Sequence, residues 1–455
     1  QATKYTPTVT TPQINRDIRQ PNSTLTDGEF NSIKNTLTFT ADKGTVNVQK
    51  DTANLTFTSN KQVNKNADGS LYITATVSYP DGSTEEIQIP VNAPAQKDIY
   101  TPTAVTKTVD KGSNPTAKDS ISNANDLPTD TRFAWKPGTL DTSTPGVKQA
   151  TVTVTYSDNT SEEVKATVNV RPTKPTVTSA NGDVTITPVN EPNVTKLVAS
   201  YTPADSNQLE DNGTVTKTPQ TATTIEANKG TDNRWTITSG GKDGISINAT
   251  TGAITLKDQV VKDQTSVTAK VAAQTIESAE GTGKATNGDQ TNPVIGASSQ
   301  IVEVGNTINI PLNLSDGTGV GIDEGNIKVT NLPTGLSYDT TTKSITGTLG
   351  TVSNNTVTVA VLDKNGNKAD KTITITAVKP KAIYTIKGAT IKNVDTAANF
   401  VEVPAGVTLT AAWKDGDKPS TATVGTTNKT VTVSLNGANT ELTIPVTVYP
   451  EVTLR

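Results

Sequence analysis

Carboxylates are the only side chains here that could support the chemistry of an active site or a metal site. The sequence contains 44 Asp and Glu residues but no His and no Cys. Without these two residue types, a Ser-His-Asp triad or a Cys-His pair cannot form. Zinc sites built on imidazole or thiolate are excluded for the same reason. Only carboxylate chemistry therefore remains to be considered.

One loop carries oxygen ligands of the kind that calcium prefers. Asp363–Lys364–Asn365–Gly366–Asn367, with Asp370 nearby, offers carboxylate and amide oxygens. The same residues also form an ordinary Asn-Gly hairpin turn between two apolar runs. We favour the turn, because this turn chemistry is common, and we predict no metal site and no cofactor. A second acidic group, Asp316 with Asp323 and Glu324, is interpreted as a solvated loop.

Patterns that could indicate catalysis have simpler explanations. Asp141–Thr142–Ser143 has the letters of an aspartic-protease signature, but it lacks the preceding apolar strand and a partner triplet, so we interpret it as a turn. A glycosidase would need two carboxylates in an aromatic cleft, and aromatic residues make up only 4% of the chain. Gly317–Gly321 does not match a phosphate-binding spacing and is expected to be a flexible loop. We predict no catalytic residue and no enzyme activity.

The residues around these loops alternate in the manner of β-hairpins. Val152, Val154 and Tyr156 precede the polar turn 157–160, and a second alternating run, 164–170, returns. Period-two spacing on both sides of a short turn is typical of a half-buried hairpin. The pattern recurs at 73–91 and at 431–448, where the turns contain Asp-Gly or Asn-Gly. A supersecondary unit repeated along one chain indicates an array.

Composition and charge support the same interpretation. The chain has 455 residues, 32% of them hydrophobic, which suits several small β-domains with thin cores. The net charge is −4 and no basic cluster occurs, so a nucleic-acid partner is not expected. No apolar run is long enough for a membrane span. The three tryptophans, Trp135, Trp235 and Trp413, each precede a strand and are predicted to plug a core.

Several local features complete these expectations. Residues 27–35 could form one helical turn capped by Asp27, and no longer helix is expected. The segments 93–95 and 171–175 contain proline and are predicted to be linkers. Residues 205–232 are polar and are expected to be irregular. Residues 276–293 are rich in Gly, Asn, Ser and Thr and are expected to form a loop or a linker.

The best-patterned stretch resembles the Rib domain of Gram-positive surface proteins. Members of that family typically read DLP…W…TPG…VTYPDGS…V, and this chain has Asp126–Leu127–Pro128, Trp135 and Thr144–Pro145–Gly146. The Tyr-Pro-Asp-Gly element is intact at Tyr79–Gly82. It is altered at Tyr156–Asn159 and reduced to Asn436–Gly437 in the third copy. The first copy lacks the Trp and the Thr-Pro-Gly.

A second resemblance, to the Ig-like and cadherin-like domains of bacterial adhesins, rests on a different pattern. Those domains read LPxGLxxD…IxGTP…V.V.D..GN, which the segments 332–339, 345–348 and 363–367 match, with Leu349 in place of the proline. The segment 245–255 (ISINATTGAIT) aligns with 336–346 (LSYDTTTKSIT) and indicates a second copy. The resemblance also implies that such domains sometimes bind calcium.

Together these features predict an all-β chain, a linear array of about five small β-sandwich modules forming an elongated rod. The predicted modules are 1–94 (atypical Rib-like), 95–171 (Rib), 172–291 (Ig-like), 292–378 (Ig-like or cadherin-like) and 379–455 (Rib-like). The resemblance implies an exported protein attached to the bacterial cell wall, such as the giant surface proteins and adhesins of staphylococci and lactobacilli. The chain is expected to be an internal fragment of such a protein.

Two functions agree with this organisation. In the first, the chain is a monomeric, non-enzymatic stalk that projects a ligand-binding region from the cell wall. In the second, one module is itself adhesive and binds a host extracellular-matrix protein or a neighbouring cell surface. Neither function involves nucleic acid or insertion into a membrane.

Overall fold

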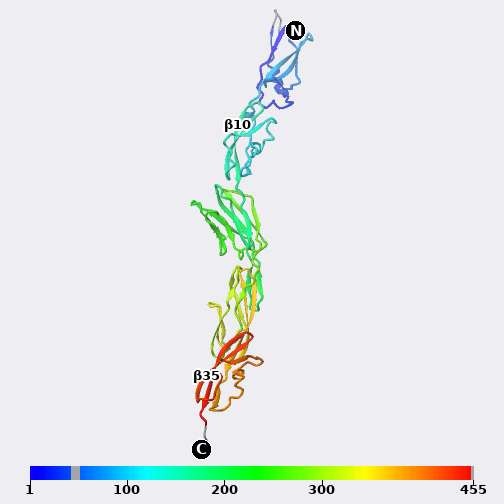
Figure 1. Cartoon of the computed structure of the whole chain (residues 1–455). Coiled ribbons are helices and arrows are strands. Elements are labelled where there is room, and N and C mark those ends of the chain that lie inside the picture. The colour runs from blue at the N-terminus through cyan, green and yellow to red at the C-terminus, as the bar shows by residue number, and fades with distance from the viewer. Residues whose placement is uncertain (42–51, 452–455) are drawn as a thin grey trace. The chain divides into compact units, whose positions relative to one another are not determined.

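Strands dominate the computed structural model, which describes residues 1–41 and 52–451 (Figure 1). The chain is all-β and builds a series of small β-sandwich units, as predicted. Among the described residues, no helix is both long and apolar enough to cross a membrane. The structure divides into two compact units. Unit 1 comprises Gln1–Lys174, Val189–Lys196 and Val271–Ala279, and unit 2 comprises Pro175–Pro188, Leu197–Lys270 and Glu280–Arg455.

A short helix packs against strands in residues 1–94. Helix α1 (Asp27–Lys34) starts with a capping box in which Thr26 accepts the N–H of Glu29 and Glu29 accepts the N–H of Thr26. The prediction that Asp27 is the cap was therefore wrong. Phe30 of α1 stacks on Phe57, with 5.4 Å between the ring centroids. The strands of this region are β1 (Tyr5–Thr8), β2 (Thr38–Ala41), β3 (Thr56–Thr58), β4 (Asn64–Lys65), β5 (Leu71–Ser78) and β6 (Thr84–Val91), and the short helix α3 (Gln96–Ile99) follows them.

The predicted hairpin of residues 95–171 is confirmed and forms the centre of a four-stranded sheet. Its strands are β9 (Gly146–Thr155) and β10 (Ser161–Arg171), the latter labelled in Figure 1. The sheet order is β7-β10-β9-β8, and β7 (Lys107–Asp110) runs parallel to β10. Val152, Val154 and Tyr156 are fully buried, as the alternation requires. The remaining elements are η1 (Ala117–Ser120) and β8 (Arg132–Trp135).

Residues 379–455 repeat this sheet strand for strand. The order is β32-β36-β35-β34, and the first strand again runs parallel to the second. Trp413 donates its indole N–H to the carbonyl of Val394, 19 residues earlier, just as Trp135 donates to Pro115, 20 residues earlier. The elements are β32 (Ile383–Ile386), η2 (Ala397–Phe400), β33 (Val401–Glu402), β34 (Thr410–Trp413), β35 (Gly425–Leu435) and β36 (Ala438–Tyr449).

Two sheets and a separate two-stranded hairpin form residues 172–291. One sheet has the order β11-β12-β19-β18; the other has the order β17-β16-β13-β20-β21, with β22 also paired to β20. Residues 205–232, expected to be irregular, contain the hairpin β14–β15 and strand β16. The strands are β11 (Thr176–Ala180), β12 (Asp183–Thr187), β13 (Val194–Tyr201), β14 (Ser206–Leu209), β15 (Val215–Thr218), β16 (Thr223–Lys229), β17 (Trp235–Ser239), β18 (Ile245–Ile247), β19 (Ile254–Leu256), β20 (Ser266–Ala273), β21 (Ile276–Glu277) and β22 (Gly281–Lys284).

Residues 292–378 form a further sandwich around an aliphatic core. One sheet has the order β24-β31-β30-β27 and the facing sheet has the order β25-β29-β28. The hairpin β28–β29 corresponds to β18–β19, which agrees with the alignment of the two segments. The strands are β23 (Val294–Ile295), β24 (Gln300–Glu303), β25 (Thr307–Pro311), β26 (Leu314–Ser315), β27 (Ile322–Thr330), β28 (Leu336–Asp339), β29 (Ser344–Thr348), β30 (Ser353–Asp363) and β31 (Lys368–Pro380).

Candidate functional site

Three aspartates that are distant in the sequence meet in unit 2. Asp289 follows β22, Asp316 follows β26 and Asp363 is the last residue of β30. One carboxylate oxygen from each lies within 4.8 Å of the other two. Asp316 and Asp363 are buried, with exposed fractions of 7% and 1%. This acidic cluster is the strongest concentration of potential metal ligands among the residues that the structure describes.

Asp363 holds the turn that the sequence predicts. Its Oδ1 accepts the backbone N–H groups of Asn365 and Asn367, each at 2.8 Å. Its Oδ2 accepts a hydrogen bond from Asn367 Nδ2 at 2.7 Å. The Asn-Gly turn between β30 and β31 is thus confirmed. It also fixes the Asp363 carboxylate facing the other two aspartates, so forming a turn does not exclude a role in ligand binding.

The glycine-rich loop 317–321 wraps around Asp316. The N–H of Gly321 donates to Asp316 Oδ2 at 2.7 Å, and the N–H of Val320 donates to Asp289 Oδ2 at 3.1 Å. A Cβ on Gly319 would lie 2.3 Å from Asp316 Oδ2 and 2.4 Å from Asp289 Oδ2. The loop was expected to be flexible, but its backbone is hydrogen-bonded to the cluster, and Gly319 leaves room for the two carboxylates.

A fourth carboxylate, that of Asp258, holds two of the segments that form the cluster. Asp258 is 5% exposed, and its Oδ2 accepts the N–H of Asp289 at 2.6 Å and Asn365 Nδ2 at 2.7 Å. Asp258 and Asp289 also line a pocket of about 120 Å³ together with Asp263 and Asn365. Burial raises the pKa of Asp258, and the negative charges of Asp263 and Asp289 raise it further.

No basic side chain neutralises these carboxylates in the described part of the chain. Five lysines of this unit pair with other carboxylates, as Lys257–Asp183, Lys262–Asp205, Lys328–Asp211, Lys343–Glu324 and Lys368–Asp370. Lys217 lines the pocket beside Asp258 and Asp289 but forms no ion pair with them. Burial, with a contribution from the charge of Asp316, raises the pKa of Asp363 above the usual range of an aspartate. The cluster is therefore stabilised by N–H donors alone.

The structure separates residues that the sequence groups together. Asp370 lies outside the cluster in its pair with Lys368, and Glu324 pairs with Lys343. Asp323 accepts hydrogen bonds from Gly325 and Asn326 instead of joining Asp316. Asp289 and Asp258 were missed, because each stands in a polar stretch without a recognisable ligand spacing. Asp141 accepts two hydrogen bonds from Ser143, as expected of a turn residue.

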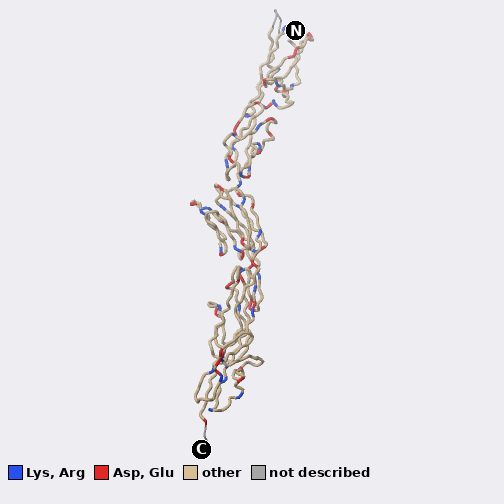
Figure 2. Tube along the Cα trace, viewed as in Figure 1, with Lys and Arg blue, Asp and Glu red and all other residues tan. Residues whose placement is uncertain are grey.

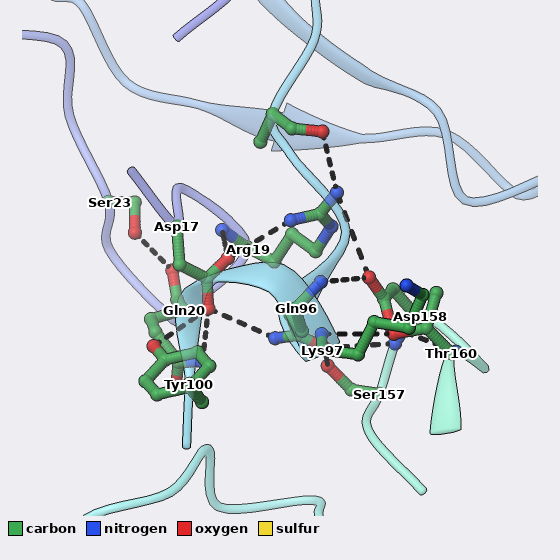
Figure 3. A network of polar contacts seen from close by, with 11 residues as sticks. Asp17, Arg19, Gln20, Ser23, Gln96, Lys97, Tyr100, Ser157, Asp158 and Thr160 are labelled. Carbon is green, nitrogen blue, oxygen red and sulfur yellow. Dashed lines mark hydrogen bonds and ion pairs between the residues drawn. The ribbon is translucent and has the colours of Figure 1, made fainter. Parts of the chain in front are cut away.

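A second polar site surrounds Gln96 in unit 1 (Figure 3). Gln96 is fully buried, at 0% exposure, although it follows the segment predicted to be a linker. Its Nε2 donates to Asp17 Oδ2 at 3.0 Å, and its Oε1 accepts from Ser157 Oγ and the N–H of Asp158, both at 3.0 Å. Its own N–H donates to Asp158 Oδ2 at 2.7 Å. Gln96 therefore ties a loop of residues 1–94 to the β9–β10 turn.

Hydrogen bonds keep the two aspartates around Gln96 ionised. Burial alone would raise the pKa of Asp17, but donors from Gln96, Gln20, Arg19 and Tyr100 outweigh it and lower the pKa. Burial also opposes ionisation of Asp158, where Thr160, the Gln96 N–H and the charge of Arg19 lower the pKa. Burial and the bond to Asp17 raise the pKa of Tyr100 to about 12.

These depressed pKa values predict acid sensitivity of unit 1. A carboxylate with a lowered folded-state pKa stabilises the fold above its unfolded pKa of about 3.9, and this stabilisation is lost as pH falls through the folded-state value. We expect Asp17→Asn to remove part of the fall in stability below about pH 4. The measurement is the urea midpoint and the amide exchange of residues 96–100 and 156–160 across that range. Exposed Asp130→Asn is the control, and equal pH profiles for the two variants would contradict the prediction.

Other buried contacts occur at the edges of the predicted modules. In unit 1, the Glu191 carboxylate, 1% exposed, accepts Lys111 Nζ at 2.8 Å and the Thr173 N–H at 2.9 Å. In unit 2, strand β31 pairs with β33, and Ile301 and Val378 belong to the same core cluster as Val431 and Ile444. The segment around Thr173, predicted to be a stiff linker, is thus held by a buried side chain.

In the described part of the chain, charges of both signs are interspersed along the trace (Figure 2). Trp235 is buried, at 4% exposure, which agrees with its predicted role as a core plug. Trp135 and Trp413 are only half-buried and lie at the edge of their cores, so the prediction that each plugs a core was too strong.

Two segments of the chain match models of known protein families. Residues 96–172 match the family model of the Rib domain. Residues 273–378 match the model described as "Putative Ig domain". The chain is 31% identical over 149 residues to the C protein alpha-antigen of Streptococcus agalactiae, a match that covers 29% of this chain and 14% of the relative. The chain thus spans only 14% of the length of the relative that it matches.

Two solved structures are among those that match this chain. A Rib structure from Streptococcus pyogenes is 40% identical, covers 17% of this chain and 98% of that chain, and has a TM-score of 0.17. Sidekick-1 immunoglobulin domains 1–5 are 10% identical, cover 98% of this chain and 100% of that chain, and have a TM-score of 0.19. The C protein alpha-antigen and the Rib structure both come from streptococci.

Proposed function

We propose that this chain is a non-enzymatic spacer segment of a Gram-positive cell-surface adhesin, built from the five modules named above. It holds a ligand-binding region away from the cell wall. The match to the Rib domain and the similarity to a streptococcal antigen support a location at the bacterial surface. The absence of His and Cys from the sequence supports a role without catalysis.

The buried junction at Gln96 is the observation that carries this proposal. A spacer transmits position only if successive modules cannot swing freely about their connections. The side-chain nitrogen, the side-chain oxygen and the backbone N–H of Gln96 all have hydrogen-bond partners. Breaking these contacts would leave buried polar groups without partners. The cost of such a loss, about 1–3 kcal/mol per group, restrains the joint. The continuation of β31 into a pair with β33 acts in the same way in unit 2.

Small-angle scattering of the full chain tests the proposal. Modules with strands of about ten residues span roughly 35–40 Å each, so five in line would reach about 180–200 Å. A thin rod of that length has a radius of gyration of about 50–60 Å, whereas a compact globule of this size would have about 23 Å. We expect the larger value. We also expect Gln96→Ala to broaden the distribution of interatomic distances, because it removes the side-chain hydrogen bonds that restrain one joint.

Exposed Lys97→Ala, next in the chain, is the matched control and should leave the scattering unchanged. A radius of gyration near the compact value would overturn the spacer function. Saturable binding of the chain to an immobilised matrix protein would instead favour the adhesive alternative.

A further inference from the structure

The acidic cluster of unit 2 has an electrostatic problem that its protein contacts do not solve. Asp289, Asp316 and Asp363 bring three carboxylates together. Buried carboxylates are normally paired with a cation or bound to a metal. Without such a partner, the loss of hydration costs on the order of several kcal/mol for each buried charge. Lys257 and Lys262 pair with other aspartates, and Lys217, which lines the adjoining pocket, forms no ion pair with the cluster. Something that is not part of these side chains must balance the charge.

One side chain of the cluster is incompletely satisfied. Asp316 is 7% exposed, and its Oδ1 has no hydrogen-bond partner among the described residues, although its Oδ2 accepts the Gly321 N–H. Asp263 Oδ1, in the adjoining pocket, is likewise buried without a partner. A carboxylate that served only to hold the glycine-rich loop would not need to leave a buried oxygen unbonded. The unbonded carboxylate oxygen of Asp316 indicates that this site binds a cation.

The spacing of the carboxylate oxygens is compatible with a calcium ion. Calcium binds six to eight oxygens at about 2.3–2.6 Å, so two ligands on opposite sides of the ion lie about 4.6–5.2 Å apart. The three carboxylate oxygens lie within 4.8 Å of one another and can share one such shell. Magnesium is usually held by one or two carboxylates and keeps several waters, so a site that gathers three carboxylates suits calcium better. The residues offer oxygen ligands only, which suits calcium and not a softer metal.

We infer that Asp289, Asp316 and Asp363 form a Ca²⁺ site, with Asp258 and Asn365 holding the Asp289 segment in place behind it. Its ligands come from three loops: the segment after β22, the loop 316–321 and the β30–β31 turn. Bound calcium would cross-link these loops and fix the segment around Asp289 against the body of residues 292–378. The inference is independent of the spacer function, because it concerns only local charge and geometry.

Calcium titration of the chelator-treated full chain tests the site directly. Calorimetry should detect at least one bound Ca²⁺ with a dissociation constant at or below about 10⁻³ M, the range of extracellular calcium modules. Calcium should also raise the temperature of one unfolding transition and slow amide exchange at 286–292, 316–321 and 363–367. Asp316→Asn and Asp289→Asn should each weaken binding at least tenfold. Asp370→Asn, an exposed carboxylate of the same region, should bind calcium like the unaltered chain.

The behaviour of Asp316→Asn in chelator separates a metal ligand from a structural residue. If Asp316 serves calcium, removing its charge relieves repulsion, and the metal-free variant should be at least as stable as the metal-free parent. A variant that is less stable in chelator and loses no calcium affinity would overturn the inference. Absence of binding at about 10 mM Ca²⁺, ten times the weak end of that range, would also overturn it. Equal binding of Mg²⁺ would overturn the choice of calcium.

Discussion

Trp235→Ala is expected to destabilise the sandwich of residues 172–291 by about 3–5 kcal/mol, the usual cost of deleting a buried large aromatic side chain. Trp235 begins β17 and is 4% exposed. Its indole covers Gly252 so closely that a Cβ there would lie 2.8 Å from the ring. Gly252 belongs to the turn that joins β18 and β19 of the other sheet. The substitution therefore removes a side chain that packs one sheet on the other.

Amide exchange measured on the full chain can locate this loss. Exchange should accelerate in 223–239 and 245–256, while peptides of β35 and β36 keep their protection. Trp135→Ala is the comparison, because its ring is half-buried and lies at a core edge; the expected loss in its own sheet is smaller. If the two substitutions had equal effects, burial of the ring would not be what determines the stability.

Alternation predicted the hairpins well, because one face of each hairpin strand must be apolar to cover a core. The strands around Val152 and Val433 lie where the pattern places them. The same logic missed β14 and β15, whose hairpin carries few apolar residues and buries Leu209 against Ala360 and Leu362. The Asn212–Gly213 pair at its turn was the available signal.

The prediction that residues 276–293 form a loop or a linker was wrong for strand β22, and the reason is physical. This segment reads as a linker, yet Gly281 and Gly283 lie in β22. A Cβ on Gly281 would lie 2.0 Å from the carbonyl oxygen of Pro175, and one on Gly283 would lie 2.7 Å from that of Val177. The glycines permit close contact between backbones, which composition cannot distinguish from flexibility.

The acidic cluster could be predicted only in part. Asp363 and Asp316 were noticed because each lies in a loop rich in oxygen ligands or glycine. Their convergence with Asp289 and Asp258 depends on how distant loops meet in three dimensions, and no local spacing encodes that. The preference for a plain turn at Asp363 rested on treating the turn and the ligand site as alternatives. In the structure, one carboxylate oxygen makes the turn while the carboxylate as a whole faces the cluster.

Gly347→Ala is expected to destabilise the sandwich of residues 292–378 by about 3 kcal/mol or more, because it combines backbone strain with a clash that cannot relax. Gly347 has φ of +132°, and a Cβ there would lie 2.0 Å from the carbonyl oxygen of Gly335. Gly335 has φ of +97°, and its Cβ would lie 2.1 Å from the carbonyl oxygen of Thr348. Both obstacles are backbone atoms, so no side chain can rotate away.

This pair of glycines explains the Gly-Leu and Gly-Thr elements of the Ig-like pattern. Leu336 is the cross-strand partner of Gly347, and the Thr348 N–H donates to the Gly335 carbonyl at 2.9 Å. The closeness of β28 and β29 at this point thus requires glycine on both strands. Gly350→Ala is the matched control, since a Cβ there would meet nothing within 4 Å. Urea unfolding, with amide exchange at 336–348 to locate the change, should separate the two substitutions, and identical curves would refute this account of the pattern.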